Sequence, residues 1–260
     1  MELFDSHAHY DDEKFDSDRH EVIEAIYASG VTKFVSAGYS LESTQKGIEL
    51  SKKYNYIYAT AGISPNDIPE DNKKVEEQLN KIEELAKTNN KVVAIGEIGL
   101  DYYWNKDNID LQKYVFNKQI EIANKLDLPI MIHTREAIMD TIEIIKNTEF
   151  VKPGIFHCCP LNKDLVLQGL KKGFYISFAG PITFKSSKNA NEIINMVPFE
   201  NILIETDSPY LSPEPNRGKR NDSRNVIYMA KKIAEVKNVD LETVASITYK
   251  NAMKVFGINE

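Results

Sequence analysis

The stretch Val92-Val93-Ala94-Ile95-Gly96-Glu97 places five apolar or small residues directly before a carboxylate. A run this short and this apolar is typical of a strand that is buried on both faces, as parallel strands are. Burying a carboxylate at the end of such a run is costly unless a cation or hydrogen-bond donors accompany it. The stretch therefore predicts a parallel strand with a polar site at its end.

Seven further runs share this character, and amphipathic segments separate them. The predicted strands cover residues 2–7, 33–37, 57–62, 92–97, 130–133, 155–157, 175–178 and 202–205. Strand and helix alternating in this way over 260 residues predict one domain, residues 1–260, folded as a single (β/α)8 barrel of the TIM type. An open doubly wound sheet is the alternative that the same periodicity allows.

Several of the intervening helices have recognisable ends. A helix is predicted from Ser17 to Ser29, with Gly30 placed to close it. The last helix is predicted to begin at Leu241, with Asp240 as its N-cap and Gly257 after its end. A further helix has apolar residues spaced for one buried face, namely Val75, Leu79, Ile82 and Ala86.

Composition restricts the class of protein. The formal net charge of −7 argues against a general nucleic-acid coating protein, although a locally positive site can still bind phosphate. Adjacent Cys158 and Cys159 do not suit a disulfide framework. No apolar stretch has the length of a membrane span. We therefore expect a cytoplasmic protein without a membrane partner, and its oligomeric state stays open.

Histidines follow the predicted strands. His7 and His9 close the first strand, and their i, i+2 spacing points both imidazoles to one side of an extended chain. His133 and His157 end the fifth and sixth strands, while the fifth histidine, His20, lies on a predicted helix. Taken singly, each could be an ordinary polar residue at the end of a strand.

Two carboxylates fall at equivalent depths, because Glu97 ends the fourth predicted strand and Asp207 follows the eighth. All these groups lie at the strand ends where barrel enzymes keep their chemistry. Six nitrogen and oxygen ligands exceed the needs of one tetrahedral centre and suit two cations that share a carboxylate. We therefore expect two divalent metal cations, with Zn, Mn, Fe and Mg not distinguished.

The same residues closely resemble the TatD family of metal-dependent deoxyribonucleases, within the amidohydrolase-like barrels. The resemblance runs in order from residue 3 to about residue 225. It rests on Phe4-Asp5-Ser6-His7-Ala8-His9, Gly96-Glu97-Ile98-Gly99-Leu100-Asp101-Tyr102, Pro129-Ile130-Met131-Ile132-His133-Thr134-Arg135, Phe156-His157-Cys158, Glu205-Thr206-Asp207-Ser208-Pro209-Tyr210-Leu211 and Arg217-Gly218-Lys219-Arg220-Asn221.

The resemblance implies a role for each ligand. His7 and His9 would hold one metal, His133 and His157 the other, and Glu97 would bridge them. Asp207 would be the catalytic carboxylate beside the metals, with Glu97 also part of the catalytic centre. Members of the family hydrolyse DNA, often as exonucleases, and some are linked to removing D-amino acids from mischarged tRNA.

The chain departs from the family pattern in loops that we expect to contact substrate. Ser64-Pro65-Asn66 replaces the usual His-Pro-His, Cys159-Pro160-Leu161 follows His157-Cys158, and Asp222-Ser223 replaces an acidic-Pro pair. None of these changes removes an expected metal ligand. The pattern therefore predicts the hydrolytic chemistry more closely than it predicts the substrate.

Several residues near the expected site suit contact with a nucleic acid. Arg135 could pair with a phosphate or with a neighbouring acid. Arg217 and Lys219, together with Arg220, could contact the phosphate backbone or only solvent. Tyr102 and the two aromatics after it could stack a base or pack beneath their loop. Ser64 and Asn66 complete the expected substrate contacts.

The sequence thus predicts a metal-dependent hydrolase that acts on phosphodiester bonds in DNA, either single-stranded or at its ends. Hydrolysis of an amide or an aminoacyl ester, such as D-aminoacyl-tRNA, is the alternative within enzymes. Outside enzymes, the alternative is a metal-stabilised barrel that binds a partner without turnover.

Overall fold

The computed structural model describes residues 1–259, and its eight parallel strands form one sheet in the order of the sequence. The strands are β1 (Leu3–Ala8), β2 (Val31–Ser36), β3 (Ile57–Ala61), β4 (Val92–Asp101), β5 (Ile130–Arg135), β6 (Ile155–Phe156), β7 (Tyr175–Phe178) and β8 (Ile202–Ile204). Each predicted strand is present, and the predicted (β/α)8 barrel is confirmed.

The barrel closes just beyond the end of β8. Ala8 forms a parallel bridge with Ser208. The backbone N–H of Asp207 donates to the carbonyl of His7 at 2.9 Å, and the N–H of His9 donates to Ser208 at 2.7 Å. An open doubly wound sheet would keep its first and last strands apart, so this alternative is excluded. The same bonds bring His7, His9 and Asp207 side by side.

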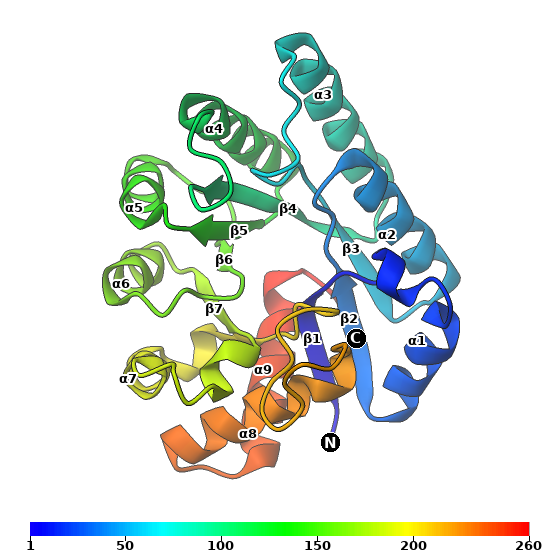
Figure 1. The fold of residues 1–260 in the computed structure, drawn as a ribbon, viewed down its shortest axis with the longest axis vertical. Helices are drawn as coiled ribbons and strands as arrows, with labels where there is room; N and C mark the ends of the chain where they lie inside the picture. Colours follow the sequence, from blue (N-terminus) through cyan, green and yellow to red (C-terminus); the bar gives the residue numbers. More distant parts are fainter. Residues whose placement is uncertain (260) are drawn as a thin grey trace.

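Helices surround the strands, with α1, α2 and α3 on one side in Figure 1 and α4 to α7 on the other. They are α1 (Arg19–Ala28), α2 (Leu41–Lys53), α3 (Asn72–Thr88), α4 (Ile109–Leu126), α5 (Ile138–Asn147), α6 (Lys163–Lys171), α7 (Ala190–Met196), α8 (Val226–Lys237) and α9 (Leu241–Val255). Short 3-10 turns lie at Glu13–Phe15, Gly180–Thr183, Phe199–Asn201 and Ser223–Asn225. Within residues 1–259, no helix combines the length and the apolar character needed to span a bilayer.

The predicted helix signals have the expected structural roles. Asp240 accepts a hydrogen bond from the N–H of Thr243 at the start of α9, and Gly257 follows that helix with φ +63°. The four apolar residues predicted to form one face of α3 are all buried. The first helix starts at Arg19, two residues later than predicted, because an irregular turn around Asp18 precedes it.

Two apolar clusters form the core. The larger cluster packs the outer faces of the strands against the surrounding helices. The smaller cluster contains strand residues such as Phe4, Met131 and Leu203, and the helical residues in it come from α9 and the turn after it. Because β-strand side chains alternate between the two faces, the smaller cluster fills the barrel interior. Met253 and Phe256 therefore close the end of the barrel at which the strands begin.

Candidate metal centre

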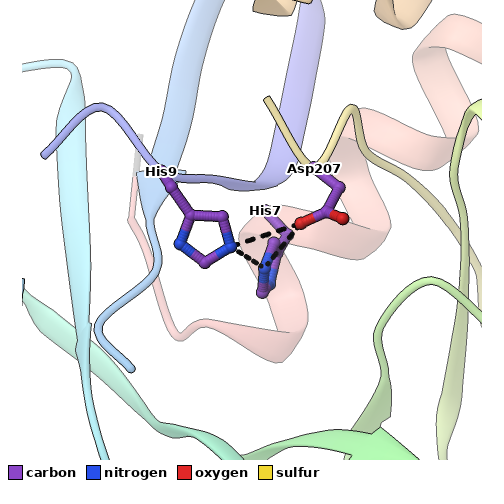
Figure 2. Close-up of side chains that lie close together, drawn as sticks. All are labelled: His7, His9 and Asp207. Atoms are coloured by element: carbon purple, nitrogen blue, oxygen red, sulfur yellow. Dashed lines mark hydrogen bonds and ion pairs between the residues drawn. The ribbon is translucent and has the colours of Figure 1, made fainter. Parts of the chain in front are cut away.

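His7 and His9 converge with Asp207 where β1 meets the segment after β8. Figure 2 shows the two imidazoles and the carboxylate turned toward one another. The Nε2 atoms of His7 and His9 lie 3.1 Å apart, and Asp207 Oδ1 lies 3.4 Å and 3.2 Å from them. Three ligand atoms at such distances can hold one cation, so the expected pairing of His7 and His9 is sterically possible.

His133 and His157 form a second group with Glu97. His133 Nδ1 lies 3.0 Å from Glu97 Oε1 and 3.3 Å from His157 Nε2, and His157 Nε2 lies 3.4 Å from the same carboxylate oxygen. These atoms also fit around a single cation. β4, β5 and the residue directly after β6 therefore contribute a second ligand group beside the first.

Glu97 faces both groups with different oxygens. Its Oε1 faces His133 and His157, while its Oε2 lies 3.5 Å from His7 Nε2 and 3.8 Å from His9 Nε2. A carboxylate with one oxygen toward each ligand group has the arrangement of a bridging ligand.

A bulge in β4 aims Glu97 at the centre. Ile95 pairs with Ile130 but Ile98 pairs with Ile132, so β4 has one extra residue between these pairs. Gly96 permits this course, because a Cβ there would lie 2.5 Å from the Cβ of Met131. The strand was predicted to end at Glu97, which is wrong, since β4 continues to Asp101 in pairing with β5.

The other ring nitrogen of three histidines contacts an oxygen acceptor. His9 Nδ1 lies 3.1 Å from the carbonyl of Ala37, and His157 Nδ1 lies 3.3 Å from Glu205 Oε1. His133 Nε2 lies 2.9 Å from Asp101 Oδ2. An N–H directed at each acceptor turns the other ring nitrogen, the one that can bind metal, toward the centre. His7 Nδ1 instead lies 2.9 Å from the sulfur of Met131.

The buried carboxylates and histidines of the site shift one another's pKa values. Burial acts to raise the pKa of Glu97, but the charge of His157 and hydrogen bonds outweigh it and lower that pKa well below its usual range. Burial is likewise outweighed at Asp207, where His7 and His9 lower the pKa. Burial opposes protonation of His9, yet Asp207 and Glu97 raise its pKa to about 9. Buried carboxylates that draw protons onto imidazoles suit divalent cations on mixed nitrogen and oxygen ligands.

A cleft of about 730 Å³ opens above this centre and is lined by five of the six expected ligands, all except fully buried His7. Among the expected substrate contacts, Ser64, Asn66 and Arg135 also line the cleft. The guanidinium of Arg135 lies 3.7 Å from the ring centroid of Tyr103. A larger hollow of about 1000 Å³ lies at the opposite end of the barrel and contains none of the ligands.

The other expected contacts lie outside the cleft lining. Tyr102 donates its hydroxyl hydrogen to Asp140 of α5 at 2.6 Å. Arg217 and Lys219 are exposed on the loop after β8, with Arg217 over the ring of Phe184 at 4.2 Å. Arg220 makes a two-pronged ion pair with Asp18, at 2.8 Å and 2.6 Å. Any ligand that reaches these residues must extend beyond the cleft.

The sequence argument assigned no role to several residues around the centre. Asp101 and Glu205 hold metal-facing histidines from behind, and Asp12 and Asp67 line the cleft. Trp104 lines it as well, and it is one of the aromatics expected to stack a base or to pack beneath their loop. Asp101 and Glu205 each follow an apolar run, which is the signal that identified Glu97, but nothing in the run shows which histidine each one contacts. Glu205 Oε2 is buried and has no hydrogen-bond partner among residues 1–259.

A TIM-type barrel with histidine and carboxylate clusters at the carboxyl ends of its strands defines the class of metal-dependent barrel hydrolases. The chain belongs to the TatD family, since the family described as TatD related DNase matches residues 4–257. Its relatives are named metal-dependent hydrolases, and the histidine and carboxylate clusters of this chain could hold metal ions. The chain is accordingly a metal-dependent hydrolase.

Two relatives and one solved structure illustrate the similarity. YabD of Bacillus subtilis, an uncharacterised metal-dependent hydrolase, is 43% identical over 99% of this chain and 100% of its own. MJ1582 of Methanocaldococcus jannaschii, with the same description, is 34% identical over 98% of this chain and 97% of its own. The crystal structure of YjjV, a TatD homologue of Escherichia coli, has a TM-score of 0.91 and 23% identity, covers 99% of this chain and 98% of that one, and supports the fold.

Proposed function

We propose that the chain hydrolyses phosphodiester bonds in DNA, at single-stranded segments or ends, with two divalent cations. The observation that carries the proposal is Glu97, whose two oxygens face two separate ligand groups. The family description as a DNase supports the choice of DNA. Zn, Mn, Fe and Mg all accept this set of nitrogen and oxygen ligands.

His7 and His9 would hold one cation, His133 and His157 the other, and Glu97 would lie between them. Divalent cations bound there lower the pKa of water and offset negative charge on phosphate oxygens. Asp207, whose Oδ1 faces the first group, would orient the attacking water and accept its proton. Arg135, on the wall of the cleft, would pair with a phosphate oxygen of the substrate. The same proposal places the protein in the cytoplasm, where its free thiols Cys158 and Cys159 remain reduced.

Hydrolysis of an amide or an aminoacyl ester is a second candidate, and one feature of the cleft favours it. Asp12 and Asp67 both line the cleft. Two carboxylates would attract an amino group and repel a phosphate that lay against them. The lining of the cleft thus includes these two carboxylates as well as Arg135, so a DNA substrate must direct its phosphates toward the arginine.

Adding metals back to chelated protein tests both candidates. Each of the four metals is supplied in turn, and hydrolysis of labelled single-stranded DNA is compared with hydrolysis of an aminoacyl ester and a peptide amide. We expect DNA cleavage that chelation abolishes, while circular dichroism shows that the barrel stays folded. Cleavage of the ester or amide alone would select the second candidate. No hydrolysis of any substrate with any metal would favour a barrel that binds without turnover.

A further inference from the structure

A second hollow, of about 370 Å³, lies beside the cleft and shares Asn66 and Trp104 with it. It is lined by Pro65, Asn66, Ile68, Trp104, Asn105 and Asn108. None of these six residues carries a charge, whereas the neighbouring cleft is lined by carboxylates, histidines and an arginine. The hollow therefore suits an uncharged group that is covalently attached to something held in the cleft.

Trp104 provides a flat apolar surface at the boundary between the two spaces. Trp104 is 67% exposed, although an indole usually buries most of its area in a core. The ring of Tyr103 meets it edge to face at 4.8 Å. An indole held in this way and left open to solvent is a surface on which a planar ring can stack.

Asp101 ties this surface to the metal centre. Its Oδ1 accepts the backbone N–H groups of Tyr103 at 2.9 Å and Trp104 at 3.1 Å. Its Oδ2 contacts His133 Nε2 at 2.9 Å and accepts from Asn66 Nδ2 at 3.2 Å. One carboxylate thus fixes the position of a metal-facing histidine, of the tryptophan and of the asparagine that both spaces share.

The amides of the hollow retain unused hydrogen-bonding atoms. The side-chain oxygen of Asn108 accepts from Gln112 at 2.7 Å, and that of Asn105 accepts from the N–H of Asp107 at 2.9 Å. Within residues 1–259, this leaves the amide nitrogens of Asn105 and Asn108, and the oxygen of Asn66, without a protein partner. Two donors and one acceptor around a flat apolar surface match the edge of a nucleobase.

We propose that this hollow binds the nucleobase of the nucleotide next to the cleaved phosphodiester, stacked on Trp104. Arg135, whose guanidinium lies over the ring of Tyr103, would pair with the phosphate that joins this nucleotide to the chain. The inference rests on the proposed function, because it requires a nucleic-acid substrate in the cleft. It adds a base-binding site outside the metal centre.

Trp104 is the only tryptophan of the chain, so a change in tryptophan fluorescence reports a group bound against this residue. The metal-loaded protein is titrated with a single-stranded tetranucleotide that has phosphorothioate linkages to slow hydrolysis, and with the same backbone without bases. We expect a saturable change in fluorescence with the first probe and none with the second. An equal response to the probe without bases would show that sugar or phosphate, and not a base, contacts Trp104.

Substitution gives an independent measurement by anisotropy of a labelled tetranucleotide. Trp104→Ala should weaken binding and raise KM about tenfold, the scale of one stacked base, with kcat changed much less. Trp104→Phe should recover most of the affinity, because a planar ring remains. Tyr114→Ala removes another exposed aromatic, on α4 and outside both spaces, and should behave as the unsubstituted protein does.

The outcomes separate this inference from the proposed function. DNA hydrolysis with silent fluorescence and an unaffected Trp104→Ala variant would overturn the base-binding site and leave the nuclease proposal standing. If metal-loaded protein neither hydrolyses DNA nor binds the tetranucleotide, both proposals are wrong.

Discussion

Glu97 and Asp207 both contact the Nε2 atoms of His7 and His9, but they differ in what else they reach. Glu97 also contacts His133 and His157 through its second oxygen, whereas the described contacts of the Asp207 carboxylate with the centre involve only the first histidine pair. At the scale of single residues, one carboxylate is therefore suited to joining two cations and the other to assisting at one side.

This difference predicts distinct metal contents for two variants. Glu97→Ala removes the one negative group that faces both ligand groups, so we expect about one bound metal per chain. Asp207→Asn keeps an oxygen in place, so we expect about two, with turnover lost because the proton acceptor is gone. Elemental analysis of the dialysed proteins measures both, and His20→Ala on the exposed face of α1 serves as the control. A Glu97→Ala protein that retains both metals would show that Glu97 is only a neighbouring carboxylate.

Glu205 is expected to raise the metal affinity of the second ligand group. Its Oε1 lies 3.3 Å from His157 Nδ1 and accepts the N–H of Cys158 at 2.6 Å, and its side chain is fully buried. Glu205→Gln keeps the size but removes the charge that makes His157 a better ligand. We expect roughly a tenfold loss of metal affinity, measured by competition with a chromophoric chelator. Unchanged affinity in a folded Glu205→Gln protein would contradict this role, and Glu200→Gln, in a surface turn, is the matched control.

At the scale of elements, the basic residues of the loop after β8 differ in their contacts. Arg220 is committed to Asp18 and to the carbonyl of Lys14, so it ties the loop to the segment before α1. Arg217 and Lys219 are exposed on the same loop. Arg217 has only a long ion pair, at 4.0 Å, with Glu214 of the same loop, so this pair is less committed than Arg220 and can meet a phosphate backbone.

The salt dependence of DNA binding tests this difference. The double variant Arg217→Ala with Lys219→Ala should make the plot of log affinity against log salt shallower by about 1.4, since each lost phosphate contact on a single strand removes about 0.7. Lys87→Ala with Lys254→Ala, at the opposite end of the barrel, should leave the slope unchanged. Equal slopes for the two double variants would mean that the loop does not touch DNA.

Apolar runs predicted every strand, because a buried parallel strand needs such a run whatever its neighbours are. The ends of strands were less predictable. β4 extends past Glu97 to Asp101 because pairing with β5 continues there, and the bulge before Ile98 depends on contacts with that neighbouring strand. A sequence pattern contains no information on such a partner.

The site shows the same limit. His7 and Glu97 stood out because a polar residue ends an apolar run. Asp101 and Glu205 also follow apolar runs, but the sequence does not show which histidine each one contacts, because that depends on which ring nitrogen points away from the centre. Asp101 contacts His133 across 32 residues and Glu205 contacts His157 across 48 residues, and only the closed barrel brings them together.

At the scale of the whole molecule, α9 and the turn after it form the floor of the barrel. Phe256 is 5% exposed and stacks on Phe4 of β1, with ring centroids 5.9 Å apart. Phe256→Ala would leave a cavity there, and we expect it to lower the free energy of unfolding by about 3–5 kcal/mol. Urea unfolding followed by circular dichroism measures the change, with exposed Met139→Ala on α5 as the control. A loss no greater than that of Met139→Ala would show that the floor adds little to stability.

The position of this floor in the chain has a consequence for biosynthesis. The six expected ligands all precede Ser208, whereas the residues that close the barrel come from α9 and the turn that follows it. A ribosome therefore synthesises all six expected ligands before it synthesises the floor of the barrel. A nascent chain interrupted between the two would carry every metal-binding group while the apolar barrel interior stayed open, the kind of surface that chaperones and proteases engage.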